Sequence, residues 1–248
     1  MRRTIVGALS GLLLAALPAA AGAKDYGPGV TDSEIKLGQT MPYSGPASAY
    51  GMIGRAEQAY FAMINDQGGI NGRKIKLISL DDGYSPSKTV EQVRRLVEEE
   101  NVLAIFNPLG TASNSAIQKY LNVKKVPQLF VSSGSSRFND PKQFPWTMPW
   151  LPSYAAEGRS AVEFILKARP NAKLAVLYQN DDLGKDYLRG VHEGLGDKVK
   201  SVIKAEISYE VSDPTVDSAI ISLQGSGADT FITIATPKFA AQAIRKAY

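Results

Sequence analysis

The stretch of sequence that decides the fold is residues 75–106, IKLISLDDGYSPSKTVEQVRRLVEEENVLAIF. The apolar run at 75–80 predicts a strand, and the Asp-Asp-Gly after it predicts where that strand ends. Pro86 can sit in the first turn of a helix, where its missing N–H costs nothing. Apolar residues then recur at helical spacing at Val90, Val93, Leu96 and Val97. With the apolar run at 103–106 the stretch becomes strand, helix, strand, which favours a parallel β-α-β unit.

The same alternation extends over the rest of the chain. Upstream lie a predicted strand at 35–39 and a helix at 47–67 that stops at a Gly-Gly pair. Downstream, helical residues at 117–121 precede a strand at 128–131. Later predicted elements are helices at 153–168, 185–195, 215–223 and 238–248 and strands at 174–178, 202–209 and 230–234. Strands separated by helices favour doubly wound parallel sheets covered on both faces, so the predicted fold class is α/β.

Residues 132–152 interrupt this alternation. Too many helix breakers for any regular element fall in this stretch, namely Gly134, Pro141, Pro145, Pro149 and Pro152. We interpret it as the passage from one α/β lobe to another. The predicted division is an N-terminal lobe at 24–150 and a C-terminal lobe at 151–248.

We expect the second lobe to be incomplete in this chain. It has only about three predicted strands, against the five or six typical of a sheet. The helical pattern at 238–248 also runs to the last residue without a Gly, Asn or Pro stop signal. The expected architecture is therefore two doubly wound parallel-sheet lobes with a ligand cleft between them.

Residues 1–23 have the layout of a secretory signal peptide. Two arginines give a positive start, the apolar run at 5–17 is too short to span a bilayer, and small residues at 21–23 suit a signal peptidase. Cleavage would leave Lys24 first, whereas a lipid-anchored receptor needs a cysteine at that point. The sequence has no cysteine. We therefore predict a protein that is secreted into the periplasm and not lipid-anchored.

The distribution of charged residues along the sequence indicates which classes of partner the protein can bind. The formal net charge is +4, and lysines and arginines are spread among acidic residues without a basic tract. Nucleic-acid binding needs a clustered basic face. The sequence therefore argues against nucleic acid as a partner.

Four loops follow the predicted strands of the first lobe, at the edge where open parallel sheets bind ligands. They are the loops at 42–51, 81–84, 107–114 and 132–137. The last two are rich in hydroxyls and glycine, and each leads into a helix start, whose free N–H groups and partial positive charge suit a small carboxylate. Thr111 and Ser136 could add hydroxyl donors. For each loop alone, helix capping by the same residue types is the alternative interpretation.

Aromatic residues near this edge could supply an apolar wall. The candidates are Tyr50, Trp150 and Tyr154, with core or hinge packing as the alternative for each. Arg137 could pair with an acidic ligand through two parallel hydrogen bonds, or be solvated.

We predict no catalytic residue, no metal and no cofactor. His192 is the only histidine and lies in a predicted surface helix, and no serine lies in a Gly-x-Ser-x-Gly elbow. The pairs Asp81-Asp82 and Asp181-Asp182 could hold Mg²⁺. However, adjacent residues leaving a strand point opposite ways, so we expect these pairs to cap turns instead.

Several motifs occur in order along the chain after residue 24. INDQGGINGR at 64–73 is fairly specific, and YSGP at 43–46 precedes it. Weaker matches are VP at 126–127 before two serines, DDLG at 181–184 and GAD at 227–229. Together they resemble the branched-chain amino acid binding proteins, the leucine, isoleucine and valine receptors of ABC importers.

The resemblance implies two α/β lobes joined by three crossover segments, closing on ligand by hinge motion. It places Tyr50 in an apolar wall, and Thr111, Gly134 and Ser136 as partners of a carboxylate and an ammonium group. Thr236 stands where these receptors often carry an aromatic residue. The complete set of candidate ligand-binding residues is Tyr50, Thr111, Ser132, Gly134, Ser136, Tyr154 and Thr236.

The sequence departs from the family pattern at some positions. Leu183 stands where the amino acid receptors have a Tyr, and Tyr84 takes a position of the disulfide that some members carry. The acidic partner for an α-ammonium group would lie beyond Tyr248. These departures leave several ligands open: branched-chain or other amino acids, aromatic acids, amides or urea.

We therefore expect a monomeric extracytoplasmic solute receptor that is not an enzyme. Its partners would be a small carboxylate-bearing ligand, such as an amino acid or organic acid, and the membrane permease of an ABC transporter. The alternatives are a secreted α/β hydrolase-type enzyme and the ligand-sensing lobe of a signalling receptor.

Overall fold

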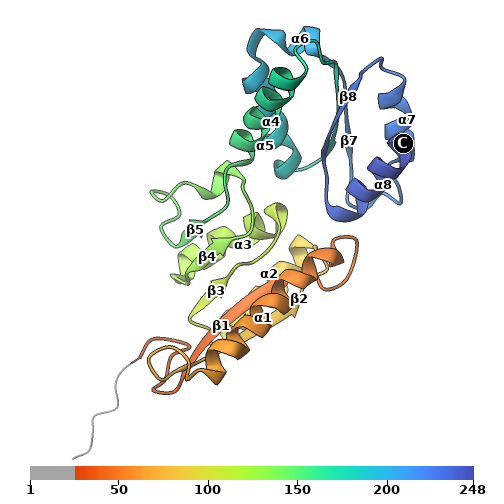
Figure 1. The fold of residues 1–248 in the computed structure, drawn as a ribbon. Coiled ribbons are helices and arrows are strands. Elements are labelled where there is room, and N and C mark those ends of the chain that lie inside the picture. The colour runs from red at the N-terminus through yellow and green to blue at the C-terminus, as the bar shows by residue number, and fades with distance from the viewer. Residues whose placement is uncertain (1–25) are drawn as a thin grey trace, which may run out of the picture.

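The computed structural model describes residues 26–248 and places them in two α/β lobes, one above the other in Figure 1. The predicted signal peptide at 1–23 lies outside the described residues. Both lobes are built on parallel sheets, so the predicted α/β fold class is confirmed. The position of the boundary between the lobes stays a prediction. Within 26–248, no helix combines the length and the apolar character that crossing a membrane requires.

The first lobe contains a five-stranded parallel sheet in the order β2-β1-β3-β4-β5. Its strands are β1 (Glu34–Met41), β2 (Lys74–Asp81), β3 (Ala104–Phe106), β4 (Gln128–Val131) and β5 (Thr147–Pro149). Its helices are α1 (Gly51–Asp66), α2 (Pro86–Glu98) and α3 (Thr111–Lys124), with a 3-10 turn η1 (Ser48–Tyr50) before α1. Buried apolar residues of α2, β3 and α3 form its main core: Val93, Leu96, Ile105, Ile117 and Leu121.

Strand β5 corrects the prediction that residues 132–152 hold no regular element. Thr147 pairs with Gln128, and Pro149 pairs with Val131 at the end of the strand. A 3-10 turn, η2 (Ser136–Phe138), also forms in this stretch. β5 is the edge strand of its sheet. A proline is tolerated there because one side of an edge strand has no ladder partner for the missing N–H.

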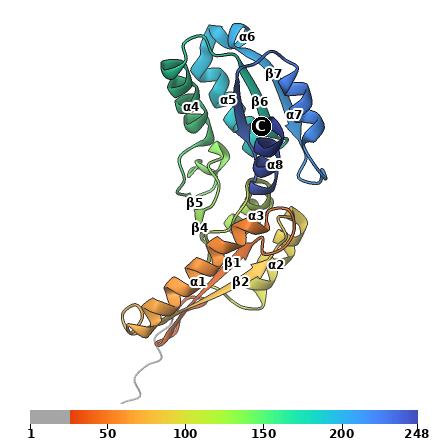
Figure 2. The same cartoon turned by 45° about the vertical axis from the view of Figure 1, so that its right-hand side comes forward.

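The second lobe contains a three-stranded parallel sheet in the order β7-β6-β8. Its strands are β6 (Leu174–Gln179), β7 (Ile203–Tyr209) and β8 (Thr230–Ile234). Its helices are α4 (Tyr154–Ala168), α5 (Asp182–Leu195), α6 (Val199–Val202), α7 (Asp217–Gln224) and α8 (Pro237–Ala247), with a 3-10 turn η3 (Gly196–Lys198). The start of α8 approaches η1 of the first lobe, and Figure 2 shows α8 directly above that lobe.

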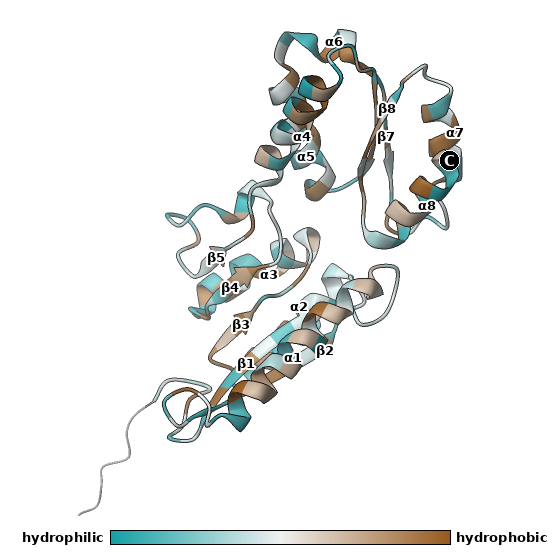
Figure 3. Cartoon of the chain, viewed as in Figure 1, coloured by the Kyte–Doolittle hydropathy of each residue, from teal (hydrophilic) through white to brown (hydrophobic). Residues whose placement is uncertain are grey.

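Both faces of the central strand β6 are buried, which explains its apolar residues, whereas exposed residues alternate along the edge strand β7 (Figure 3). Leu174 packs into the core formed with α4 and α5, whereas Leu177 packs into the core formed with α7 and α8. Side chains alternate between the faces of a strand, so a central strand covered on both sides must be apolar throughout.

Gly134 lies where the chain passes between the lobes. The Tyr154 N–H donates to the Gly134 carbonyl oxygen at 2.9 Å. A Cβ on Gly134 would stand 2.3 Å from the carbonyl oxygen of Pro152. The backbone segments at Gly134 and Pro152 are therefore too close together for residue 134 to carry a side chain.

Candidate functional site

A cavity of about 410 Å³ lies between the lobes, which we call the interlobe cavity. It is lined by loops and helix starts that follow β1, β2, β3, β4, β5 and β6, at the carboxyl edges where parallel sheets place their ligands. Its lining residues are Tyr50, Ile53, Tyr84, Asn107, Leu109, Gly110, Thr111, Ser132, Trp150, Leu151, Tyr154 and Leu183. None of these side chains is an acid or a base.

The N-terminus of α3 opens on the interlobe cavity. Its first residue, Thr111, is fully buried, and its Oγ1 lies 2.7 Å from Ser133 Oγ. The N–H groups of the first turn have no partner inside a helix, and among the described residues none accepts those of 111–113. A 14-residue helix thus directs its partial positive charge at a cavity without charged side chains.

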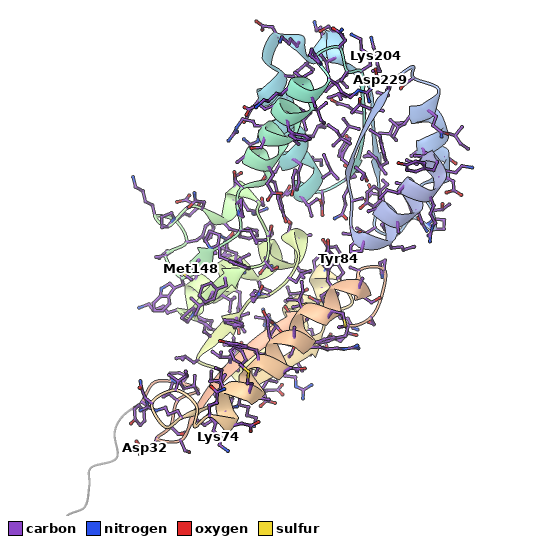
Figure 4. The ribbon with its side chains drawn as sticks, viewed as in Figure 1. Asp32, Lys74, Tyr84, Met148, Lys204 and Asp229 are labelled. Atoms are coloured by element: carbon purple, nitrogen blue, oxygen red, sulfur yellow. The ribbon has the colours of Figure 1, made fainter. Side chains whose placement is uncertain are left out.

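Tyr84 lies directly against this helix start. Figure 4 places it at the edge of the first lobe that faces the second. Gly110 has φ +106°, and a Cβ there would be 2.9 Å from the Tyr84 ring. Burial raises the pKa of the Tyr84 and Tyr50 hydroxyls, so both remain neutral donors at ordinary pH.

Tyr154 provides an aromatic wall from the second lobe. Its ring stacks on Tyr187 with centroids 4.5 Å apart. A second cavity of about 340 Å³ shares Tyr50, Tyr154 and Leu183 with the interlobe cavity and continues beside α4 and β8. The two cavities are therefore adjoining parts of one cleft.

Polar side chains join the lobes beside the cleft, in what we call the interlobe polar contact. Asp186 Oδ2 of α5 accepts hydrogen bonds from Ser135 Oγ and from the Ser136 N–H, both at 2.9 Å. Arg189 donates to Asp186 at 3.0 Å and to Ser136 Oγ at 3.2 Å. Arg137 pairs with Asp182 at 2.7 Å on the exposed side.

The pKa of Asp186 reflects these contacts. Burial acts to raise it, but hydrogen bonds from Ser136, Arg189 and Ser135 outweigh burial and hold the pKa below its ordinary value. The carboxylate form is therefore the one that ties the lobes together.

The Asp81-Asp82 pair caps turns, as predicted, whereas Asp182 of the second pair instead binds Arg137. Asp81 accepts hydrogen bonds from the N–H groups of Tyr43, Ser44 and Gly83. Asp82 is buried and accepts from Thr89 Oγ1 at 2.8 Å. Within the described part of the chain no three His, Cys, Asp or Glu side chains gather as a metal site.

Asp181 explains why α5 begins earlier than the predicted helix at 185–195. Its side chain accepts the N–H groups of Leu183 and Gly184 and so caps the helix. The cap also fixes the position of Leu183 at the edge of the cleft.

Comparison with known proteins places this arrangement in a family. A family model described as periplasmic binding protein matches residues 34–248. The chain belongs to this family. A curated relative, Leu/Ile/Val-binding protein homolog 7 of Brucella abortus (strain 2308), is 23% identical over 211 residues, covering 81% of this chain and 52% of the relative. The chain thus spans about half the length of the curated relatives it matches.

Solved structures of periplasmic binding proteins share the fold. A substrate-binding periplasmic protein from Ralstonia solanacearum superposes with a TM-score of 0.78 at 29% identity, over 86% of this chain and 60% of that one. A fatty acid ABC transporter substrate-binding protein from Thermomonospora curvata gives a TM-score of 0.77 at 25% identity, over 90% and 56% of the two chains. These proteins are named as substrate-binding proteins rather than as enzymes.

The structure brings four of the seven candidate residues together. Tyr50, Thr111, Ser132 and Tyr154 all line the interlobe cavity. Gly134 and Ser136 line a neighbouring hollow of about 360 Å³ beside the interlobe polar contact. Thr236 lines neither of these cavities; it is buried in the second lobe, where its N–H donates to Tyr209 Oη at 2.9 Å. The ligand-binding role of all seven stays a prediction.

Several cavity residues were not among the candidates. They are Ile53, Tyr84, Asn107, Leu109, Gly110, Leu151 and Leu183, with Trp150 named only as a possible wall. Tyr84 lies three residues after the end of β2 and Asn107 follows β3 directly, which is a signal the sequence does carry. Their positive φ values, 62° and 45°, depend on the tertiary structure and are not visible in the sequence.

Proposed function

We propose that this protein is the solute-binding receptor of an ABC importer and that its ligand is a small carboxylate-bearing solute, such as an amino acid or an aromatic acid. The observation that carries the proposal is the start of α3 facing the uncharged interlobe cavity. A buried anion needs donors that replace its lost water. The free N–H groups of a helix start supply such donors without a basic side chain.

The rest of the cleft suits an apolar side chain on that solute. Tyr50, Leu109 and Trp150 line the same cavity as the helix start. Burying an apolar group of the size of leucine against such a wall contributes about 2–3 kcal/mol. Relatives support the chemistry, because one is named for leucine, isoleucine and valine and another for fatty acids, all of which carry a carboxylate.

The two lobes suit a receptor that closes around its solute. Closure would bring Tyr154 and Leu183 of the second lobe over the ligand and exclude water, with the motion absorbed where the chain crosses between the lobes. The closed form would then dock on the membrane permease as a monomer. Residues 1–23 would direct secretion to the periplasm.

The test is calorimetric titration of the purified protein with a panel of amino acids, aromatic acids, fatty acids, short amides and urea. We expect saturable binding of at least one carboxylate class and none of its methyl ester, which lacks the carboxylate. A ligand at about 100 times its dissociation constant should also raise the free energy of unfolding by roughly 2.7 kcal/mol.

Two results would contradict the proposal. One is equal binding of an acid and its methyl ester, which would remove the carboxylate from recognition. The other is steady turnover of ester or phosphate substrates that disappears in Asp82→Ala, which would favour the hydrolase alternative.

A further inference from the structure

A continuous series of polar contacts lies beneath the floor of the interlobe cavity. Tyr43 Oη lies 2.6 Å from Ser79 Oγ, and Ser79 Oγ donates to Gln39 Oε1 at 2.8 Å. Gln39 Nε2 donates to one oxygen of Glu57, and Asn107 Nδ2 donates to the other at 2.6 Å. Glu57 therefore receives one amide donor on each carboxylate oxygen.

Asn107 links this series to the cavity. It follows β3 directly, lines the interlobe cavity, and is only 8% exposed. Its backbone is fully engaged, because its N–H donates to the Leu129 carbonyl and its own carbonyl accepts from Gln39. The side-chain oxygen Oδ1, however, is buried and has no partner among the described residues. A buried acceptor without a partner is costly and needs an explanation.

Glu57 determines which way the Asn107 amide faces. A carboxylate only accepts hydrogen bonds, so the NH₂ group must face Glu57, and a flipped amide would bring two acceptors together. Burial raises the pKa of Glu57, and the hydrogen bonds from Gln39 and Asn107 work against that shift by stabilising the carboxylate. The charge behind the amide also polarises it, which makes Oδ1 a stronger acceptor.

We infer that Glu57 is a positioning residue that holds Asn107 Oδ1 ready to accept a hydrogen bond from the ligand. The inference rests on the proposed function and narrows its substrate class. The start of α3 and the residue Asn107 line one cavity, only a few residues apart in the chain. The matching solute carries a carboxylate with an amino or hydroxyl group on the adjacent carbon, as α-amino and 2-hydroxy acids do.

The experiment compares matched ligands by calorimetric titration. One series is leucine, 2-hydroxy-4-methylpentanoate, 4-methylpentanoate and 4-methyl-2-oxopentanoate. The other is phenylalanine, 3-phenyllactate, 3-phenylpropionate and phenylpyruvate. In the unmodified protein, the amino or hydroxy acid of at least one series should bind 10-fold or more tighter than the acid without that group.

Two variants separate positioning from structure. Asn107→Gly tolerates the φ of 45° and removes the acceptor, so the affinity for the amino or hydroxy acid should fall until it lies within 2-fold of the affinity for the plain acid. In Glu57→Gln, the new side-chain NH₂ group can donate to Asn107 Oδ1, which turns the Asn107 amide around so that its own NH₂ group faces the ligand. The preference should then shift toward the 2-oxo acid, because its oxo group only accepts hydrogen bonds. Asp66→Asn, exposed on the same helix, is the matched control and should change nothing.

The failures of the two proposals are distinguishable. If no acid of either series or of the wider panel binds, the proposed function fails and this inference fails with it. If acids bind but the unmodified protein shows no preference, or if both variants weaken every ligand equally, the receptor function stands and the role of Asn107 is wrong. Should Asn107→Gly not fold, as judged by circular dichroism, Glu57→Gln alone decides.

Discussion

The two lobes differ in what they present to the cleft. The first lobe contributes all the polar recognition groups, namely a helix start, hydroxyls and the buried polar series that ends at Asn107, together with apolar and aromatic lining such as Leu109 and Tyr50. The second lobe contributes Leu151, Tyr154 and Leu183, which are apolar or aromatic, and keeps its charged residues Asp182 and Asp186 on the interlobe polar contact. The difference suggests a division of work, in which the first lobe recognises the solute and the second covers it.

The largest expected effect tests recognition by the first lobe. Ala112→Asp puts an exposed negative charge in the first turn of α3. At about 4 Å from a bound carboxylate, repulsion of several kcal/mol would weaken binding about 100-fold or more. The helix itself should gain about 0.3–1 kcal/mol from the same charge.

Ser218→Asp in α7 is the matched control, because it puts the same charge at a second-lobe helix start away from the interlobe cavity. Calorimetric titration and thermal melts of both variants separate the effects. Equal loss of affinity in the two would show that the start of α3 has no special role.

A smaller effect is expected at the second-lobe wall. Tyr154→Ala removes the ring that stacks on Tyr187, and loss of a buried aromatic side chain costs about 3 kcal/mol of stability. Affinity should fall about 10-fold and by the same factor for all ligands of a series, since the wall contacts their shared apolar part. Tyr154→Phe should retain both the stability and the ligand affinity of the unmodified protein. A change in preference between amino and plain acids in Tyr154→Ala would break the proposed division of work.

The smallest effect is expected at the interlobe polar contact. The pKa of Asp186 is lower in the folded protein than its ordinary value near 3.9, so its contribution is present above that value and is lost as pH falls through the folded pKa. Asp186→Asn should cost about 1–2 kcal/mol at pH 7 and loosen the lobes. The control is Asp182→Asn, whose pair with Arg137 is exposed and worth about 0–1 kcal/mol.

Chemical unfolding and small-angle scattering, each between pH 3 and 7, measure these two properties. If the difference in stability between Asp186→Asn and the unmodified protein stays constant over that range, titration of Asp186 does not govern the contact.

The sequence predicts the layers of the fold well because apolar runs and helical spacing are local. The stretch at 75–106 forms the strand, helix and strand expected of it. Strand β5 was not predicted because its pairing with β4 forms only in the folded protein. In the local sequence, Pro149 argued against a strand. Within the fold, the aspartate caps were predictable because the geometry of adjacent residues leaving a strand is also local.

The candidate site was less predictable. Thr111 and Ser136 have the same local pattern, a hydroxyl after a strand, yet Thr111 lines the cavity and the Ser136 side chain meets Asp186 and Arg189. The difference arises from α5, which lies some 50 residues further along the chain. Asn107 was missed because its importance depends on Glu57, a contact between residues far apart in sequence.

The most direct test of the central claim is a crystal structure of the protein with the tightest ligand from the panel. We predict carboxylate oxygens about 3 Å from the N–H groups of residues 111–113, with an amino or hydroxyl group of the ligand at Asn107 Oδ1. A ligand whose carboxylate is held by second-lobe side chains, with the start of α3 facing water, would contradict it.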